Sequence, residues 1–313
     1  MKYFAKKFLT LIITLFIVSL LAFLAFQIIP GDPTTKMLGT EATEEAKAAL
    51  RAQLGLDGPV YLRYWNWLTG FLRGDMGISY SYSMPVEDML ADKLPVTAVL
   101  TLLAFVITVV ISIPLGVCAG SVRNSVVDKL VTALDQAVMS VPAFFVGILL
   151  CYVCGLTMKL FTPGAYIPLS ENPAGCIAYL VFPAIAIAVP RCAMTVKMLR
   201  GAILNEMGQD YVRTSKSRGA SRWDTLSRHV LRNALVPTIA FLAVTVAELM
   251  TGSIIIEQVF SIPGIGRLLL ASIGNRDFPV VQAIVVIMAS WIVIVNFIAD
   301  LLYQLVDPRI RLQ

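Results

Sequence analysis

Long apolar stretches recur along the chain and are separated by shorter segments rich in polar residues. Six of these stretches approach or exceed the roughly 20 residues that a helix needs to cross the hydrocarbon layer of a bilayer. They cover residues 8–29, 96–118, 134–156, 177–196, 236–256 and 280–303. The pattern predicts an all-α polytopic membrane protein with six transmembrane helices. It divides into an N-terminal anchor span (1–29), an extracytoplasmic loop with short helices (30–94) and a five-span core (95–313).

The composition supports a membrane class. The chain is 58% hydrophobic and 14% charged, whereas soluble domains carry about 25% charged residues. Disordered chains are poor in apolar residues, so that class is excluded. The chain has only five cysteines, an odd number, and most of them lie in or beside apolar runs. A disulfide scaffold is therefore excluded.

Positive charges predict the orientation, because lysine and arginine remain on the cytoplasmic side of membrane proteins. If the N-terminus is cytoplasmic, the inner segments hold most of the 25 lysine and arginine residues, with Arg191 counted among them. Both termini are therefore expected in the cytoplasm, and the net charge of +5 needs no nucleic-acid partner. The first span is expected to be an uncleaved anchor, because it exceeds the roughly 7–15 apolar residues of a signal peptide.

Two outer segments contain predicted surface structure. In the loop 30–94, an Ala/Glu-rich helix is expected over residues 43–54, with Thr43 as its N-cap. The aromatic stretch 61–71 that follows favours a helix on the outer headgroups, and the alternative is a docking surface for an external partner. In the segment 257–279, Pro263 and Gly264 predict a turn before a short surface or re-entrant helix over residues 267–273.

The inner loop 197–235 is basic and has helical periodicity. Two amphipathic helices joined at Gly219 are predicted, because glycine tolerates the left-handed backbone of a helix end. The apolar face of the first comprises Ile203, Leu204, Met207, Tyr211 and Val212, and that of the second comprises Trp223, Leu226, Val230, Leu231, Ala234 and Leu235. The basic faces could attract anionic lipid, at about 1 kcal/mol per lysine or arginine, or dock a partner.

Several chemistries lack their sequence signatures. The chain has no Walker A motif and no Gly-x-Ser-x-Gly elbow. Its single histidine, His229, falls on the basic face of the second inner helix and is interpreted as a solvated surface residue. The acidic residues form no evident catalytic pair. The sequence therefore predicts neither an intramembrane enzyme nor a cofactor bound by this chain.

One acidic residue, Glu248, lies near the middle of the fifth predicted span. A charge at that depth costs at least about 2.5–3.5 kcal/mol. Two interpretations stay open: Glu248 lines a translocation path together with Thr245 and Ser253, or its carboxyl group is satisfied by a neighbouring helix. Prolines at 114, 142, 183 and 190 interrupt apolar runs and are expected to kink their helices.

Motifs spread along the chain carry a family resemblance. The inner loop contains Gln209–Thr214, Lys216, Arg218, Gly219 and His229–Pro237. Other motifs are Pro30–Pro33, Gly74–Ser79, Glu257, Phe260, Pro263–Arg267, Asn275–Pro279, Asp300–Tyr303 and Asp307–Arg311. Together they resemble permease subunits of bacterial ATP-binding-cassette importers, most closely the dipeptide/oligopeptide/nickel family. The chain departs from the general Glu-Ala-Ala signature of such permeases, because Arg213-Thr214-Ser215 occupies that triplet.

The resemblance implies a set of partners. These are the lipid bilayer of the bacterial inner membrane, a second homologous permease subunit, two cytoplasmic ATPase subunits that bind ATP and Mg²⁺, and an extracytoplasmic substrate-binding protein. Coupling to the ATPase is assigned by resemblance to Asp210, Tyr211, Val212, Arg213, Lys216, Arg218 and Gly219, with Tyr211 and Val212 as apolar anchors. Docking of the binding protein is assigned to Glu257, Pro263, Gly264, Arg267, Arg276 and Asp277.

The cargo implied by the resemblance is a di- or oligopeptide, and nickel or a metal chelate is the alternative within the same family. The lack of intramembrane histidine disfavours ligation of a naked metal ion. An alternative of another class is an ATP-independent secondary transporter. That class predicts charged relays in several spans and inverted repeats.

Overall fold

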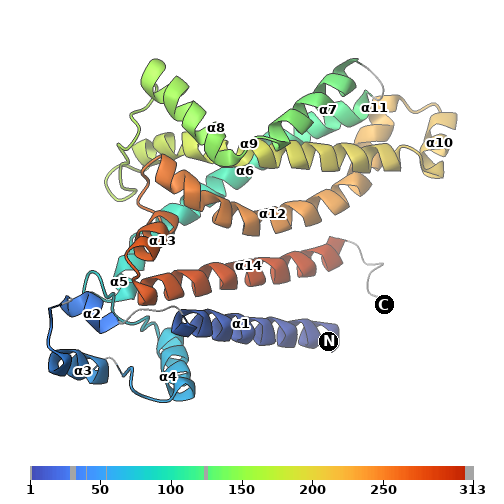
Figure 1. Ribbon diagram of the computed structural model, residues 1–313. Coiled ribbons are helices and arrows are strands. Elements are labelled where there is room, and N and C mark those ends of the chain that lie inside the picture. The colour runs from blue at the N-terminus through green and yellow to red at the C-terminus, as the bar shows by residue number, and fades with distance from the viewer. Residues whose placement is uncertain (1, 29–32, 40, 54, 123–125, 307–313) are drawn as a thin grey trace. The chain divides into compact units, whose positions relative to one another are not determined.

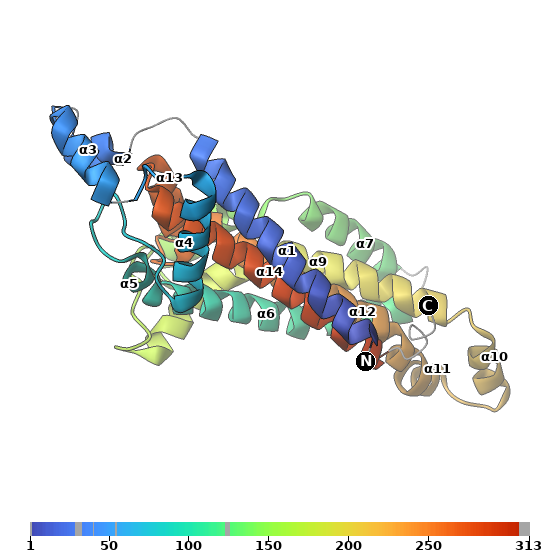
Figure 2. The ribbon, with the colours of Figure 1, turned by 90° about the horizontal axis from the view of Figure 1, so that it is seen from below.

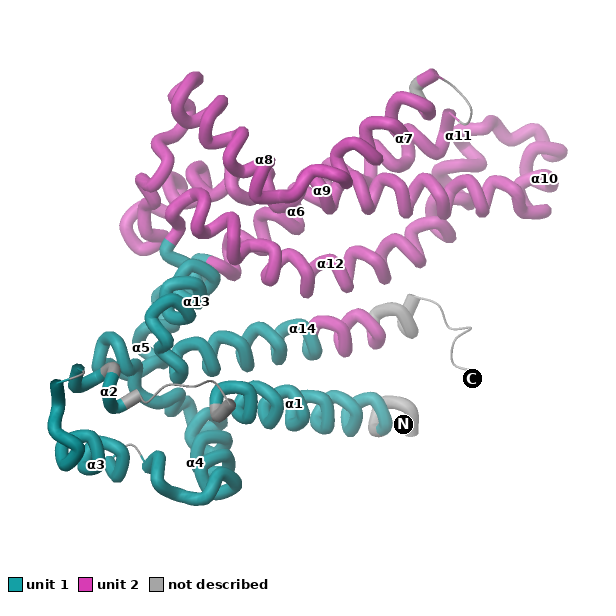
Figure 3. Tube along the Cα trace, in the orientation of Figure 1, with its two compact units in different colours: residues 1–96, 263–294 teal, residues 97–262, 295–313 magenta. Residues whose placement is uncertain are grey.

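The computed structural model describes residues 2–28, 33–39, 41–53, 55–122 and 126–306. The predicted motif parts Pro30–Asp32 and Asp307–Arg311 lie outside the described residues. Within the described ranges the regular structure is helical, and extended pairing is limited to an isolated bridge between Ile78 and Pro85. The chain divides into two compact units, residues 1–96 with 263–294 and residues 97–262 with 295–313 (Figure 3).

The helices are labelled in Figure 1. The first unit contains α1 (Lys2–Ile28), α2 (Pro33–Leu38), α3 (Glu44–Gln53), α4 (Val60–Arg73), α5 (Val86–Ala91), α13 (Ile265–Gly274) and most of α14 (Phe278–Val306). The second contains nearly all of α6 (Leu94–Ser121), then α7 (Val126–Met139), α8 (Ala143–Leu150), the π-helical turn η1 (Cys151–Thr157), α9 (Pro173–Glu206), α10 (Asp210–Ser217), α11 (Arg222–Thr225), η2 (Leu226–Val230) and α12 (Leu231–Val259).

The predicted membrane spans are confirmed in part. Among the described residues, five helices are long and apolar enough to cross a membrane, and the number rises to six if one bent pair counts as a span. The bent pair is the predicted third span, where Asp128–Met139 and Ala143–Thr157 meet at 94°. Pro142 causes a break here because it disfavours a helical conformation at the preceding residue. A single straight helix over 134–156 was therefore wrong.

Spans four and five extend past their predicted ends. α9 runs for 34 residues from the Asn172 cap, whose side chain accepts a hydrogen bond from the Gly175 amide. Helical structure from Arg222 continues through η2 into α12. Prolines inside these helices leave them unbroken. Much of the inner loop is therefore a direct continuation of two spans.

Small residues allow α6 and α9 to approach closely. A Cβ atom on Gly116 would lie 2.9 Å from Leu199 Cδ2, and one on Gly120 would lie 2.8 Å from Ile203 Cγ2. Glycines four residues apart are typical of close helix crossings in membranes. This crossing fixes the end of α9 that leads into the inner loop.

In the first unit, α4 packs against α1 (Figure 2). The Tyr64 hydroxyl lies 2.9 Å from Ser19 Oγ, and the Tyr64 ring makes an edge contact with Phe23 at 5.4 Å between centroids. Trp67 also contacts Phe23. The aromatic stretch is thus partly a helix–helix contact rather than wholly a surface belt, although Trp65 remains 53% exposed. The predicted N-cap is confirmed, since Thr43 Oγ1 accepts from the Ala46 amide at 3.3 Å.

Candidate functional site

The inner loop folds into a short helix, α10, between two breaks. Helix α9 ends at Glu206, and Gln209 adopts an extended conformation before α10 begins at Asp210. The prediction of one amphipathic helix that continues through residue 208 was therefore wrong. The helix is interrupted there because Gly208 has a low helix propensity. The predicted joint at Gly219 is confirmed: its φ is +82°, and the Ala220 amide donates to the Ser215 carbonyl.

A compact apolar cluster holds α10 to the long helices. Its six members are buried side chains from α9, α10, η2 and α12: Leu199, Ile203, Val212, Leu226, Val230 and Ala234. Ile113 and Val117 of α6 pack against the same cluster. Helix α10 thus packs, through this cluster, with the long helices α6, α9 and α12 of its own unit.

This cluster corrects two predicted positions. Val212, expected to be an apolar anchor for a partner, is 1% exposed and is part of the chain's own core. Trp223, expected on the apolar face of the next helix, is 64% exposed. Trp223 lies in the first turn of α11, one turn before the helix meets the cluster at Leu226.

Two polar contacts orient α10. The Tyr211 hydroxyl donates to Glu206 Oε2 at 2.6 Å, which ties the helix to the end of α9. Burial and this hydrogen bond raise the pKa of Tyr211 to about 12. The Ser215 and Thr225 hydroxyl groups lie 3.0 Å apart and join α10 to α11.

The opposite face of α10 carries exposed charges, namely Asp210, Arg213, Lys216 and the adjoining Arg218. The Arg213–Asp210 pair has an N–O distance of 3.6 Å, with side chains 81% and 95% exposed. Such exposed pairs contribute little to folding stability. The charges therefore remain available for recognition of another protein.

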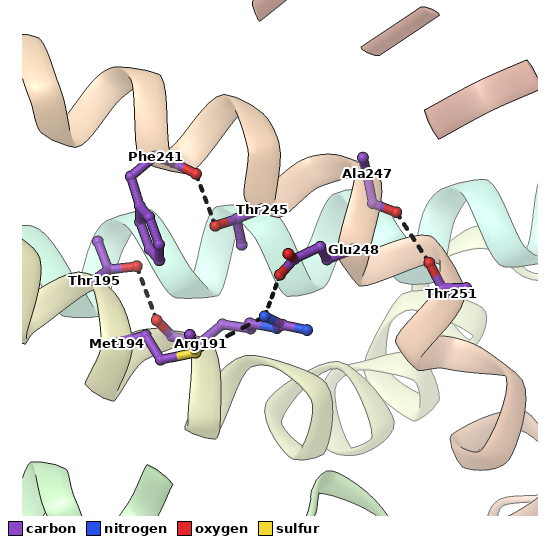
Figure 4. Close-up of polar contacts among 8 residues, drawn as sticks. All are labelled: Arg191, Met194, Thr195, Phe241, Thr245, Ala247, Glu248 and Thr251. Atoms are coloured by element: carbon purple, nitrogen blue, oxygen red, sulfur yellow. Dashed lines mark hydrogen bonds and ion pairs between the residues drawn. The ribbon is translucent and has the colours of Figure 1, made fainter. Parts of the chain in front are cut away.

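An ion pair joins the membrane-spanning helices α9 and α12. Arg191 Nη1 donates to Glu248 Oε2, and Figure 4 shows both side chains pointing toward one another. Arg191 lies inside α9, which continues to Glu206, about 22 Å further along the helix. The available sequence signal was a basic residue inside one predicted span and an acidic residue inside the next.

The hydroxyl residues predicted to accompany Glu248 have other partners. Thr245 is 1% exposed, and its hydroxyl donates to the Phe241 carbonyl at 2.9 Å (Figure 4). Ser253 is buried and donates to the Met250 carbonyl at 2.8 Å. Both side chains are directed into the helix packing, so Glu248 alone of the three is accessible as a candidate for the path.

A cavity of about 520 Å³ lies on the same side of α9 and α12 as the ion pair. Its walls are mostly apolar and include three methionines. The lining residues are Met139, Met194, Lys197, Met198, Gly201, Ala202, Asn205, Pro237 and Phe241. Arg191 Nη1 lies 3.8 Å from Met194 Sδ, which connects the ion pair with the cavity wall.

The predicted docking residues for a binding protein separate into buried and exposed groups. Glu257 is fully buried and accepts hydrogen bonds from Thr97 at 2.7 Å and Ser253 at 3.2 Å. Asp277 is also fully buried. Neither carboxylate is therefore accessible to a partner. Gly264 is buried at the start of α13, Pro263 is half-buried, and Arg267 and Arg276 are exposed.

Asp277 organises a loop of the first unit. Its carboxylate accepts from Ser79 Oγ at 2.5 Å, from the Tyr80 amide at 2.9 Å and from the Ser81 amide at 3.3 Å. The sequence motifs around residues 79 and 277 are thus two halves of one structural contact.

Three sequence relatives are similar along nearly the whole chain. A putative peptide transport system permease protein of Brucella abortus is 38% identical over 295 residues, 94% of each chain. A probable peptide ABC transporter permease protein of Sinorhizobium fredii is 32% identical over 309 residues, 99% of each chain. The glutathione transport system permease protein GsiC of Escherichia coli is 33% identical over 312 residues, 99% of each chain.

Two family matches cover the chain. Residues 1–101 match the N-terminal part of the membrane components of binding-protein-dependent transport systems. Residues 112–312 match the family described as binding-protein-dependent transport system inner membrane component. With its apolar helices, the chain is a multi-pass protein of the bacterial cytoplasmic membrane. It belongs to the family of binding-protein-dependent inner membrane components, the permease subunits of ATP-binding-cassette importers.

Proposed function

We propose that this chain forms half of a translocation pathway for di- or oligopeptides and that α10 couples ATP hydrolysis in partner subunits to alternating access. The observation that carries the proposal is the attachment of α10. Its apolar side is fixed to α6, α9 and α12, whereas its charged side is exposed. A force applied to α10 would therefore move three membrane helices together, which suits a rigid-body transition.

The proposed assembly follows from the family. A second homologous permease completes the pathway, two cytoplasmic ATPase subunits bind ATP and Mg²⁺, and a binding protein delivers the cargo outside. Both termini and α10 then face the cytoplasm, as the distribution of lysine and arginine favours. The exposed Arg267 and Arg276 are retained as docking candidates for the binding protein.

The relatives support a peptide cargo over nickel. Two of them are named as peptide transport permeases, and the third as a glutathione transport permease. Membership of the family also argues against the alternative hypothesis of an ATP-independent secondary transporter. Coupling through a dedicated contact with an ATPase is therefore the mechanism to test.

The test reverses charge on the exposed face of α10. The double variant Arg213→Glu/Lys216→Glu leaves the apolar cluster intact, so folding should be unaffected. We expect peptide uptake by the reconstituted assembly to fall about tenfold or more, as for loss of an interfacial contact worth at least about 1.4 kcal/mol. Arg73→Glu, an exposed site on α4, is the matched control and should retain uptake. If the double variant took up peptide at the wild-type rate and still bound the ATPase subunits, α10 would be excluded as the coupling contact.

A further inference from the structure

One face of α9 and one face of α12 form a continuous strip between the ion pair and the cavity. Along α9 the residues recur at intervals that place them on one side of a helix. They are Arg191, Met194, Lys197, Met198, Gly201, Ala202 and Asn205. On α12, Pro237 and Phe241 line the cavity and Glu248 lies two turns beyond. Figure 4 shows Arg191, Met194, Phe241 and Glu248 gathered between the two helices.

Neither charge of the ion pair is sealed from its surroundings. The Arg191 side chain is 24% exposed and the Glu248 side chain 48% exposed. An accessible charge at membrane depth faces water or protein rather than lipid, since exposure to hydrocarbon is costly. The strip therefore borders an aqueous or protein-lined space, as a path for a polar cargo requires.

The two parts of the strip have complementary chemistry. A guanidinium group presents paired donors that match a carboxylate, and a carboxylate accepts from an ammonium group. Methionine side chains are flexible and polarizable, so a wall containing Met139, Met194 and Met198 can adapt to side chains of different shape. A volume of about 520 Å³ falls within the range of small-molecule sites.

We propose that this strip is a transit site for a zwitterionic peptide. Arg191 receives the terminal carboxylate, Glu248 receives the terminal ammonium group, and the methionine cavity receives the side chains. When no peptide is present, the two charges neutralise each other, which avoids an isolated charge in the membrane. The inference rests on the proposed peptide-import function and adds to it the chemical groups that the permease itself recognises.

The first test neutralises both charges at once, so that neither is left unpaired. The Arg191→Gln/Glu248→Gln variant is assembled with its partner subunits and binding protein in proteoliposomes, and uptake of alanyl-phenylalanine is measured. We expect uptake to fall about tenfold, as for loss of charge-assisted contacts. Stimulation of ATP hydrolysis by the loaded binding protein should persist, because α10 is unchanged. Wild-type uptake in this variant would overturn the proposal and make the pair purely structural.

A second variant fills the cavity without touching either charge. A Cβ atom on Gly201 would meet no atom within 4 Å, so a larger side chain there can extend into the cavity. Gly201→Leu should therefore lower dipeptide uptake while ATPase stimulation continues. Ala133→Leu is the control that should transport normally, because Ala133 is an exposed residue of α7 that does not line the cavity. Normal uptake by Gly201→Leu would overturn the proposal.

The two experiments separate this inference from the proposed function. If the wild-type assembly imports the dipeptide and both variants do so equally well, the transit site is wrong and the import function stands. If the wild-type assembly imports no peptide at all, the proposed function fails and the transit site fails with it.

Discussion

Three carboxylates that the sequence places in or beside membrane spans have different environments. Glu248 forms an accessible ion pair with Arg191, Glu257 is buried among hydroxyl groups, and Asp277 is buried beneath a loop that it holds by three hydrogen bonds. Burial of a charge is tolerated when hydrogen bonds compensate for lost water. The role of each residue therefore follows from its partners and exposure rather than from its position along the chain.

At this scale we predict that Asp277→Ala destabilises the protein. The substitution leaves the Ser79 hydroxyl and the Tyr80 amide without their acceptor, at a cost of about 1–3 kcal/mol in the free energy of unfolding. Thermal unfolding of the purified protein in detergent measures the loss. Asn275→Ala, an exposed neighbour, is the control and should unfold at the wild-type temperature. Equal stability of the two variants would show that the carboxylate is not structurally important.

At the scale of elements, the informative feature is how α10 begins and ends. Periodicity alone predicted an uninterrupted helix before Gly219, but the chain leaves α9 at Glu206 and starts again at Asp210. Because of this break, the Val212 side chain packs in the apolar cluster, and the Arg213 and Lys216 side chains are exposed. A short helix with one buried and one charged side is suited to transmit force between a partner and the membrane helices.

The left-handed joint after α10 gives the second prediction. Gly219→Val places a β-branched residue at a φ of +82°, which costs about 1–2 kcal/mol. We expect the variant to be expressed at the membrane but to hydrolyse ATP without proportionate peptide uptake, because α10 can no longer hold its orientation. Gly219→Asn is the matched control, since asparagine tolerates this conformation better. Full coupling in Gly219→Val would remove the joint from the mechanism.

At the scale of the whole molecule, the family and the spans agree on a multi-pass inner-membrane protein. In the proposed orientation, α10 would meet the ATPase in the cytoplasm, and Arg267 on α13 would face the binding protein outside. The same orientation puts the basic inner loop on the side where lysine and arginine are retained. One polypeptide can then receive a signal on one side of the membrane and respond on the other.

Orientation is tested by labelling single cysteines in a variant whose five native cysteines are replaced. Lys216→Cys on α10 should react with a membrane-impermeant maleimide only in inverted vesicles, and Arg267→Cys on α13 only in intact cells or spheroplasts. Both positions are exposed, so access depends on the side of the membrane. Labelling of both from the same side would contradict the proposed topology.

The sequence by itself determined the helical membrane class, the approximate spans, the helix stop at Gly219 and the family. These follow from local properties, namely apolar length, helix propensity and motif spacing. Only the tertiary structure decided that residues 126–157 bend sharply, that Val212 is buried and that Arg191 pairs with Glu248. The last contact joins residues 57 positions apart, and the contact between Ser79 and Asp277 joins residues 198 apart. Periodicity reports which residues share a face of one helix, but the partner of a buried or intramembrane charge depends on which helices pack together.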